Sequence, residues 1–283
     1  MAAYLWHGQF LSRDRAAAAL GEMSGCEPSP AIIKALLQAQ VAHFDETGFR
    51  AGGKLAWVHS ASSGKHVLVT VHARRGSGGM DAAGVLPSFA GIAVHDAWAP
   101  YDTYTGIAAH ALCNARVLRE LAAVTGTGTG LDITWARQAI TALLKLKDAA
   151  DAARGAGQHA IDPDLLARHV KDLTDAAETG IVVNAGRSSK LQGKRHALAS
   201  RMKQRQDDYL RFARDLRVPF DNNQAERVIR MSKLRIKVSG CMRSMAGAGT
   251  FCTIRSYLAT AARHSVTALA RAAAGRPFIP ETA

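Results

Sequence analysis

The chain has 283 residues and a mass of 30.1 kDa, which indicates one large domain or a domain with a sizeable insertion. Hydrophobic residues make up 48% of it, enough to bury a core and to exclude a disordered chain. Lys and Arg number 36 against 23 Asp and Glu. The resulting charge of +13 favours a polyanionic partner, with nucleic acid ahead of an anionic membrane surface.

The cysteines and the first residues bear on the cellular compartment. The four cysteines form no CxxC pair, so we expect reduced thiols rather than disulfides or a structural zinc site. The opening MAAYLWHGQF lacks the basic-then-apolar layout of a signal peptide, and no run approaches the roughly 18 apolar residues of a membrane span. We expect a soluble, cytoplasmic protein without a membrane partner.

The first hundred residues predict a helical segment followed by a small sheet. Helical spacing covers residues 11–39, interrupted at Pro28 and Pro30. Alternating or apolar segments then predict strands at 41–45, at 54–62 after a Gly-Gly turn, at 66–75 and at 91–96. A helix is expected at 81–89, before the last of these strands. This order predicts a mixed sheet in an α/β layer.

From about Asn114 the pattern is helical almost throughout. Helices are predicted at 114–124, 131–154, 162–178 and 189–217, with a TGTGTG linker at 125–130. The last helix has one apolar face, made of Leu191, Leu198, Met202, Tyr209, Ala213 and Leu216. Pro219 ends it, and Asp221 or Asn222 can cap the next helix, with Gln224 as a capping-box partner of Asp221.

Positive charge and three carboxylates stand out against this framework. Residues 187–237 hold 15 Lys or Arg and 5 Asp or Glu, a local balance of +10. Asp45 and Asp96 end predicted strands, where an acid on an otherwise buried face is unusual, although a turn or loop cap explains either one alone. Glu226 lies in a basic helical segment, and an ion pair with Arg230 explains it alone.

Several blocks of sequence together resemble the insertion sequence 66 family of bacterial transposases. They are DETGFR (45–50), VHDAWAPY (94–101), HALCNARVLREL (110–121), PFDNNQAERVIRMSKLRIKVSG (219–240), RSYLATA (255–261) and AGRPFIP (274–280). The resemblance implies a ribonuclease-H-like core with a catalytic triad of Asp45, Asp96 and Glu226. The fold class expected is α/β, a ribonuclease-H-like mixed sheet with a large all-helical insertion and helical N- and C-terminal segments.

The resemblance also implies a division of the chain and a chemistry. We expect a helical segment at 1–40, the first part of the core at 41–112, the insertion at 113–218, and the completion of the core at 219–283. Three carboxylates that converge to within about 4 Å repel one another by roughly 4 kcal/mol per pair at an effective dielectric constant of 20. Divalent cations bound between them relieve this repulsion. We therefore expect two Mg²⁺ or Mn²⁺ ions that support DNA cleavage and strand transfer.

The expected partner is DNA, both the ends of the element and its target. Candidate phosphate contacts flank Glu226 and comprise Arg227, Arg230, Lys233, Arg235 and Lys237. Three roles are open for Asn222 and Asn223: to cap the helix, to orient Glu226 or to touch DNA. Capping is the preferred one. A homo-oligomer on paired ends, accessory proteins of the same element, and association with the bacterial nucleoid are further expectations.

Two departures from the family leave a second hypothesis open. His110 and Cys113 have a spacing that suits zinc, but without a second pair a structural role is preferred. The family has His three residues after this Cys, where this chain has Arg116, a side chain that neither ligates metal nor shuttles a proton. The N-terminal segment also looks shortened. The alternatives to an active transposase core are an inactive DNA-binding remnant and a general ribonuclease-H-like nuclease.

Overall fold

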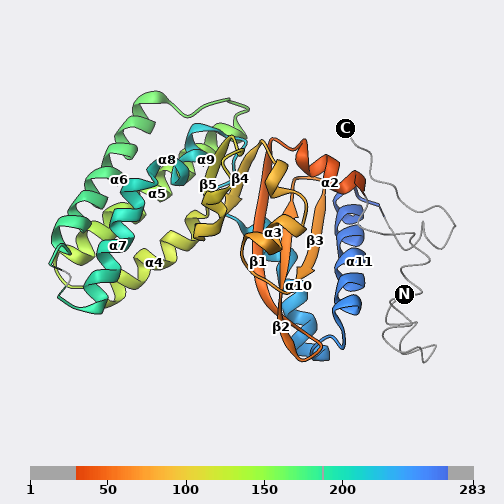
Figure 1. Ribbon diagram of the computed structural model, residues 1–283. Helices are drawn as coiled ribbons and strands as arrows, with labels where there is room; N and C mark the ends of the chain where they lie inside the picture. Colours follow the sequence, from red (N-terminus) through yellow and green to blue (C-terminus); the bar gives the residue numbers. More distant parts are fainter. Residues whose placement is uncertain (1–29, 187, 267–283) are drawn as a thin grey trace. The chain divides into compact units, whose positions relative to one another are not determined.

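The computed structural model describes residues 30–186 and 188–266, which form two compact units (Figure 1). The first unit contains residues 30–93, 98–108 and 223–266, and the second contains residues 94–97 and 109–222. The chain therefore leaves the first unit and later returns to it. Of the predicted N-terminal helical segment, α2 (Pro30–Leu37) is confirmed, and residues 1–29 lie outside the described part.

The first two strands, β1 (Val41–Ala51) and β2 (Lys54–Ser62), form a hairpin. Gly52 and Gly53 join them with φ angles of +59° and +73°, as a two-residue hairpin turn requires. The strand predicted at 54–62 is confirmed as β2. The prediction that the first strand ends at Asp45 is wrong. The strand continues because Glu46 pairs with His59 in the antiparallel register, and the pairing runs on to the turn.

The remaining strands complete a mixed five-stranded sheet. β3 (Val67–His72) pairs antiparallel with β2, and with β4 (Ile92–His95) and β5 (Ala109–Leu112) the order is β3-β2-β1-β4-β5. β3 and β4 confirm the strands predicted at 66–75 and 91–96. β5 was not predicted, because AHAL is short and has no β-branched side chain. The predicted fold class, α/β with a mixed sheet, is confirmed.

Helices cover both faces of the sheet in the first unit (Figure 1). On one face, α10 (Asn223–Ser239) and α11 (Met245–Arg263) share a core with Phe49, Val58 and Val69. Burial raises the pKa of the Cys252 thiol in this core to about 12. The other face packs on shorter elements, namely α2, α3 (Ser77–Ala82), η2 (Leu86–Ser88) and η3 (Ala99–Thr103). The helix predicted at 81–89 is thus replaced by α3 and η2, since Pro87 begins a new turn there.

The outer edge of β3 is occupied by side chains of α11. Val67 N–H donates to Thr260 Oγ1 at 3.0 Å, and Val69 N–H donates to Ser256 Oγ at 2.7 Å. Both hydroxyl-bearing residues are fully buried. They belong to the RSYLATA block, so this block has a structural function in satisfying backbone donors of an edge strand.

The second unit is largely helical. The helices predicted at 114–124, 131–154 and 162–178 are confirmed as α4 (Asn114–Thr127), α5 (Leu131–Gly155) and α6 (Pro163–Val183). α4 extends into the predicted TGTGTG linker as far as Thr127. Trp135 of α5 is fully buried. Because Gly180 of α6 has no side chain, the Trp135 ring and Ala199 can lie close to the backbone of α6. A Cβ at Gly180 would stand 2.8 Å from the Trp135 ring and 2.9 Å from Ala199 Cβ.

The single helix predicted at 189–217 is wrong. It is divided into α7 (Lys190–Gln204), α8 (Gln206–Tyr209) and α9 (Arg211–Arg214). Two side chains from elsewhere in this unit, the buried Asn114 and the half-buried Arg154, bind backbone carbonyls from Tyr209 onward. Asn114 Nδ2 donates to Tyr209 O at 2.9 Å, and Arg154 donates to Leu216 O at 2.8 Å and more weakly to Phe212 O at 3.4 Å. These tertiary bonds compete with the local helical pattern from Tyr209 onward, and none of the three involves the break at Arg205.

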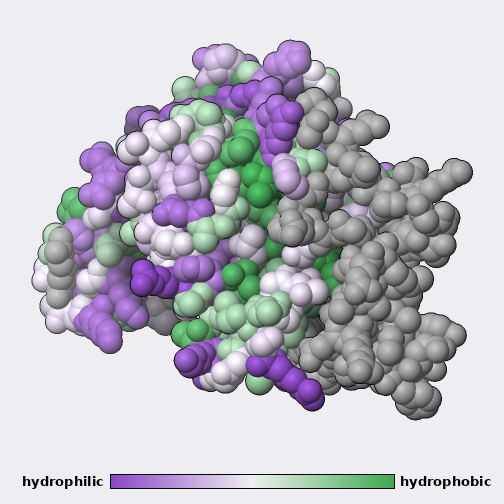
Figure 2. All heavy atoms as spheres, turned by 45° about the vertical axis from the view of Figure 1, so that its right-hand side comes forward, coloured by the Kyte–Doolittle hydropathy of each residue, from purple (hydrophilic) through white to green (hydrophobic). Residues whose placement is uncertain are grey.

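On the face in Figure 2, hydrophilic side chains are widely spread and hydrophobic ones gather in a smaller central area. Among residues 30–186 and 188–266, none of the helices has the length and apolar character needed to cross a membrane.

Candidate functional site

Asp45 lies in the middle of β1 and is half-buried. Every second side chain of a strand lies on the same face, so Asp45 shares a face with Thr47 and Phe49. This is the face of the sheet on which α10 packs. Asp45 Oδ1 accepts the Glu46 N–H at 2.9 Å, and its backbone carbonyl accepts Ser60 Oγ–H at 3.2 Å. These contacts fix both the carboxylate and its strand.

Glu226 lies in the first turn of α10 and is also half-buried. α10 packs against β1 and β2, with Ala225 and Ile229 buried. Gln224 Nε2 donates to the Ser63 carbonyl at 2.5 Å, which ties the start of α10 to the end of β2. Asp45 and Glu226 are therefore carried by two elements of one unit that pack against each other.

The two asparagines before Glu226 lie in different environments. Asn222 is buried and immediately precedes α10, in the capping position expected from the sequence. Its N–H donates to Cys113 Sγ at 3.3 Å. Asn223 is the exposed first residue of the helix. The side chain of Gln224 reaches Ser63, so it is used for packing α10 onto the sheet.

Asp96 follows β4 and belongs to the second unit. Its side chain is 23% exposed and forms an ion pair with Arg116. Arg116 Nε also lies 3.5 Å from Glu120 Oε1, one turn further along α4. The structure thus groups two of the predicted triad residues in one unit, and it gives the third a cationic partner.

The predicted DNA-binding residues follow Glu226 along α10. The side chains of Arg227, Arg230, Lys233 and Lys237 are exposed. The side chain of Arg235 lies outside the described part of the chain. α10 therefore presents exposed positive charge along the helix that also carries Glu226.

His110 and Cys113 make contacts that favour the structural interpretation over zinc. Cys113 is buried, and its sulfur accepts the Asn222 N–H. His110 Nδ1 lies 2.9 Å from His95 Nε2, so one ring donates to the other. Burial, with a smaller contribution from His110, holds the pKa of His95 well below its usual value, so this ring is neutral at pH 7.

A buried polar cluster beside Asp45 was not predicted from the sequence. The Glu46 side chain is 1% exposed, and it accepts Tyr101 O–H at 2.6 Å and Arg75 Nη2–H at 2.8 Å. The Arg75 guanidinium lies over the Trp98 and Trp57 rings, 3.9 and 4.9 Å from their centroids. The DETGFR and VHDAWAPY blocks contain Glu46, Trp98 and Tyr101, and that was the available signal.

Removing the cation from this cluster should destabilise the first unit. We expect Arg75→Met to lower the free energy of unfolding by roughly 1.5–3 kcal/mol, because the buried Glu46 carboxylate loses a charged donor. Adding Glu46→Gln should recover part of the loss, since no buried charge then remains. Urea titration of both variants and of Glu46→Gln alone measures the coupling. If Arg75→Met and the double variant lose the same free energy of unfolding, this account is contradicted.

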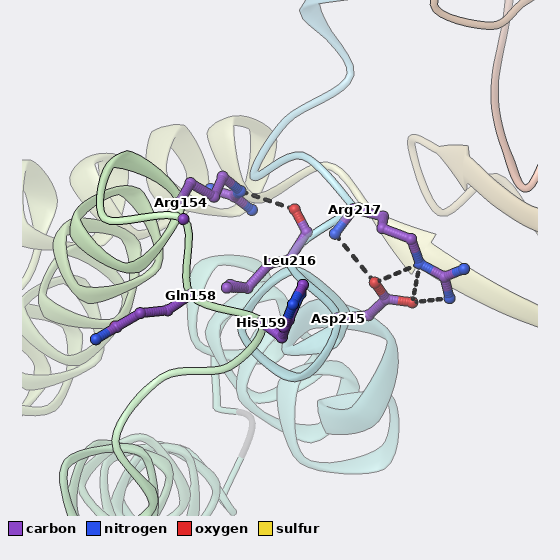
Figure 3. A pocket seen from close by; sticks show the side chains of 7 residues that line it. Arg154, Gln158, His159, Asp215, Leu216 and Arg217 are labelled. Atoms are coloured by element: carbon purple, nitrogen blue, oxygen red, sulfur yellow. Dashed lines mark hydrogen bonds and ion pairs between the residues drawn. The ribbon is translucent and has the colours of Figure 1, made fainter.

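A separate hollow of about 460 Å³ lies in the second unit (Figure 3). Its lining includes Arg154, bound to the Leu216 carbonyl, and Arg217, paired with Asp215 at 2.6 Å. Gln158 and His159 lie beside them. None of the site residues predicted from the sequence is among its described lining residues, and its arginines already have partners.

Comparison with known proteins identifies a family. The sequence pattern of a protein family described as "Transposase IS66 family" matches residues 14–250, which is most of the chain. The matched region includes Asp45, Asp96 and Glu226. No curated protein matches the chain.

Proposed function

Because this chain belongs to the IS66 family of transposases, we propose that it is an Asp-Asp-Glu transposase that cleaves DNA at the ends of an insertion sequence and joins them to a target. Asp45, Asp96 and Glu226 are the proposed catalytic residues. The observation that carries the proposal is the placement of Asp45 and Glu226, two half-buried carboxylates on β1 and α10, which pack against each other.

The proposed cofactor is Mg²⁺ or Mn²⁺, in two ions. The donor set fits these ions, because all three side chains offer hard carboxylate oxygens and none offers sulfur or imidazole. When bound, such ions activate a water or a 3′-hydroxyl and stabilise the leaving oxygen of an in-line displacement. The protein's own contribution is to fix the carboxylates. The Glu46 N–H holds Asp45 Oδ1, and the Gln224 contact with Ser63 fixes the first turn that carries Glu226.

The proposed DNA contacts lie on α10. Exposed cations one and two turns from Glu226 suit the phosphates of a strand held at that residue. Arg235 belongs to the same proposed group by its position in the sequence. The wider assembly is proposed to be a homo-oligomer on paired element ends, with accessory proteins of the same element, acting on the bacterial nucleoid in the cytoplasm. Residues 113–218 are proposed to be an insertion within the catalytic core, between its parts at 41–112 and 219–283, with residues 1–40 as a helical N-terminal segment.

Charge reversal on α10 should weaken DNA binding without a change in sequence preference. For Arg230→Glu with Lys233→Glu, we expect the slope of log K against log salt to fall by about 2, because two phosphate contacts are lost. Fluorescence anisotropy on two unrelated duplexes measures this. Arg137→Glu with Lys145→Glu is the matched control, since both side chains are exposed on α5 and the charge change is the same. A loss on only one duplex would instead assign base contacts to these residues.

Cleavage and strand transfer with DNA that carries the element's own ends test the proposed function. We expect Mg²⁺- or Mn²⁺-dependent nicking at the ends and, with target DNA present, joined products. Nicking at random positions without joining would favour a general nuclease. The ion pair between Arg116 and Asp96 favours a second candidate, an inactive DNA-binding remnant. DNA binding without cleavage in either metal would identify that state.

A further inference from the structure

We propose that Arg116 competes with a divalent cation for Asp96 and so lowers the affinity of the metal site, because its guanidinium pairs with the carboxylate that the cation would bind. This inference rests on the proposed function, in which Asp96 is a metal ligand. The contact joins Arg116 Nη1 to Asp96 Oδ2 within the second unit.

The backbone brings the two side chains together. The Cys113 N–H donates to the His95 carbonyl at 3.0 Å, which joins the start of α4 to the end of β4. Asp96 directly follows His95, and Arg116 lies in the first turn of α4, just after Cys113. His95 is further fixed because its Nδ1 accepts the Ala97 N–H at 3.2 Å. The ion pair is therefore built on a tied backbone rather than on two mobile side chains.

A second carboxylate lies within reach of the same guanidinium. Arg116 Nε is 3.5 Å from Glu120 Oε1, and Glu120 in turn pairs with Arg201. Arg201 Nε donates to Tyr209 Oη at 2.9 Å, which anchors the far end of this chain of contacts. Glu120 can therefore accept Arg116 when Asp96 turns to a cation. In this proposal Glu120 is the alternative acceptor that frees Asp96 for the metal.

The expected size of the effect follows from the exposure of the pair. The Arg116 and Asp96 side chains are 48% and 23% exposed, so water screens the interaction. A single and a double charge about 6 Å apart in water repel enough to change a dissociation constant by about tenfold.

Binding of Mn²⁺, followed by the electron paramagnetic resonance of the free ion, tests the inference without requiring catalysis. Arg116→Gln should bind Mn²⁺ about tenfold more tightly than the wild type, and Arg116→Lys should stay near the wild type because it keeps the charge. Glu120→Gln should bind Mn²⁺ more weakly, because the alternative acceptor is weakened. Arg137→Gln on α5, an exposed cation with the same change of charge, should leave the affinity unaltered.

Asp96→Asn separates failure of this inference from failure of the proposed function. If Asp96→Asn weakens Mn²⁺ binding at least tenfold while Arg116→Gln matches the wild type, the role of Arg116 is wrong and the metal site stands. If Asp96→Asn binds Mn²⁺ as the wild type does, Asp96 is not a ligand and the proposed triad fails with it. Thermal unfolding of each variant checks the fold. If Arg116→Gln does not fold, a wild-type-like Glu120→Gln would overturn the inference.

Discussion

Asp45→Asn, Asp96→Asn and Glu226→Gln are each expected to abolish metal-dependent DNA cleavage while leaving the protein folded. Each change removes a negative charge but keeps the size of the side chain, so packing around β1 and α10 is preserved. The metal contributes several kcal/mol to the transition state, and a loss of about 4 kcal/mol corresponds to a rate roughly a thousandfold lower. A time course of nicking on DNA with the element's ends measures the loss.

Asp148→Asn is the control for this series, because Asp148 is an exposed acid on α5 and the change in charge is identical. It should cleave at the wild-type rate. If one of the three variants keeps its activity, that residue leaves the proposed triad, while the other two assignments stand. Circular dichroism before each assay distinguishes lost chemistry from lost folding.

Trp135→Ala should have the largest effect on stability. Trp135 is fully buried in the second unit, where Gly180 allows α6 to lie against its ring. Removing the ring leaves a cavity between α5 and α6, and the surrounding side chains relax only partly into such a space. We expect a loss of about 3–5 kcal/mol in the free energy of unfolding. Hydrogen exchange should show the loss in α5 and α6 first.

Leu144→Ala provides the comparison on the same helix. Leu144 is 40% exposed, so its truncation should cost less than about 1 kcal/mol. Similar losses for the two variants would mean that the Trp135 ring is not the centre of this core. Hydrogen exchange in β1 and β2 should change little in either variant, because these strands belong to the first unit.

Local patterns predicted the fold wherever local forces decide it. The Gly52-Gly53 turn located the hairpin, because few other residues accept positive φ at both turn positions. α5 and α6 followed from helical spacing over many residues. The loss of the helical pattern beyond Tyr209 could not be predicted, because the bonds from Asn114 and Arg154 that compete with it come from distant parts of the sequence. β5 was missed because only its sheet partner makes so short a segment a strand.

The residues of the candidate site could be predicted from sequence motifs, but the contacts that support them could not. Asp45, Asp96 and Glu226 stand in recognisable blocks of sequence, so they were proposed before any geometry. The partners of Glu46 depend on the register of the sheet and on a loop that brings Arg75 back beside it. The attachment of Arg116 to Asp96 likewise depends on the bond between Cys113 and His95, for which the sequence gives no sign.

The hydroxyls of Ser256 and Thr260 have a consequence for self-association. An edge strand with unpaired N–H groups invites another strand to extend the sheet, which is a route to aggregates and to edge-to-edge dimers. Here α11 binds those groups at Val67 and Val69, so a foreign strand would first have to displace a helix that packs on the sheet. If copies of this chain associate, the β3 edge of the sheet should therefore not be the surface through which they meet.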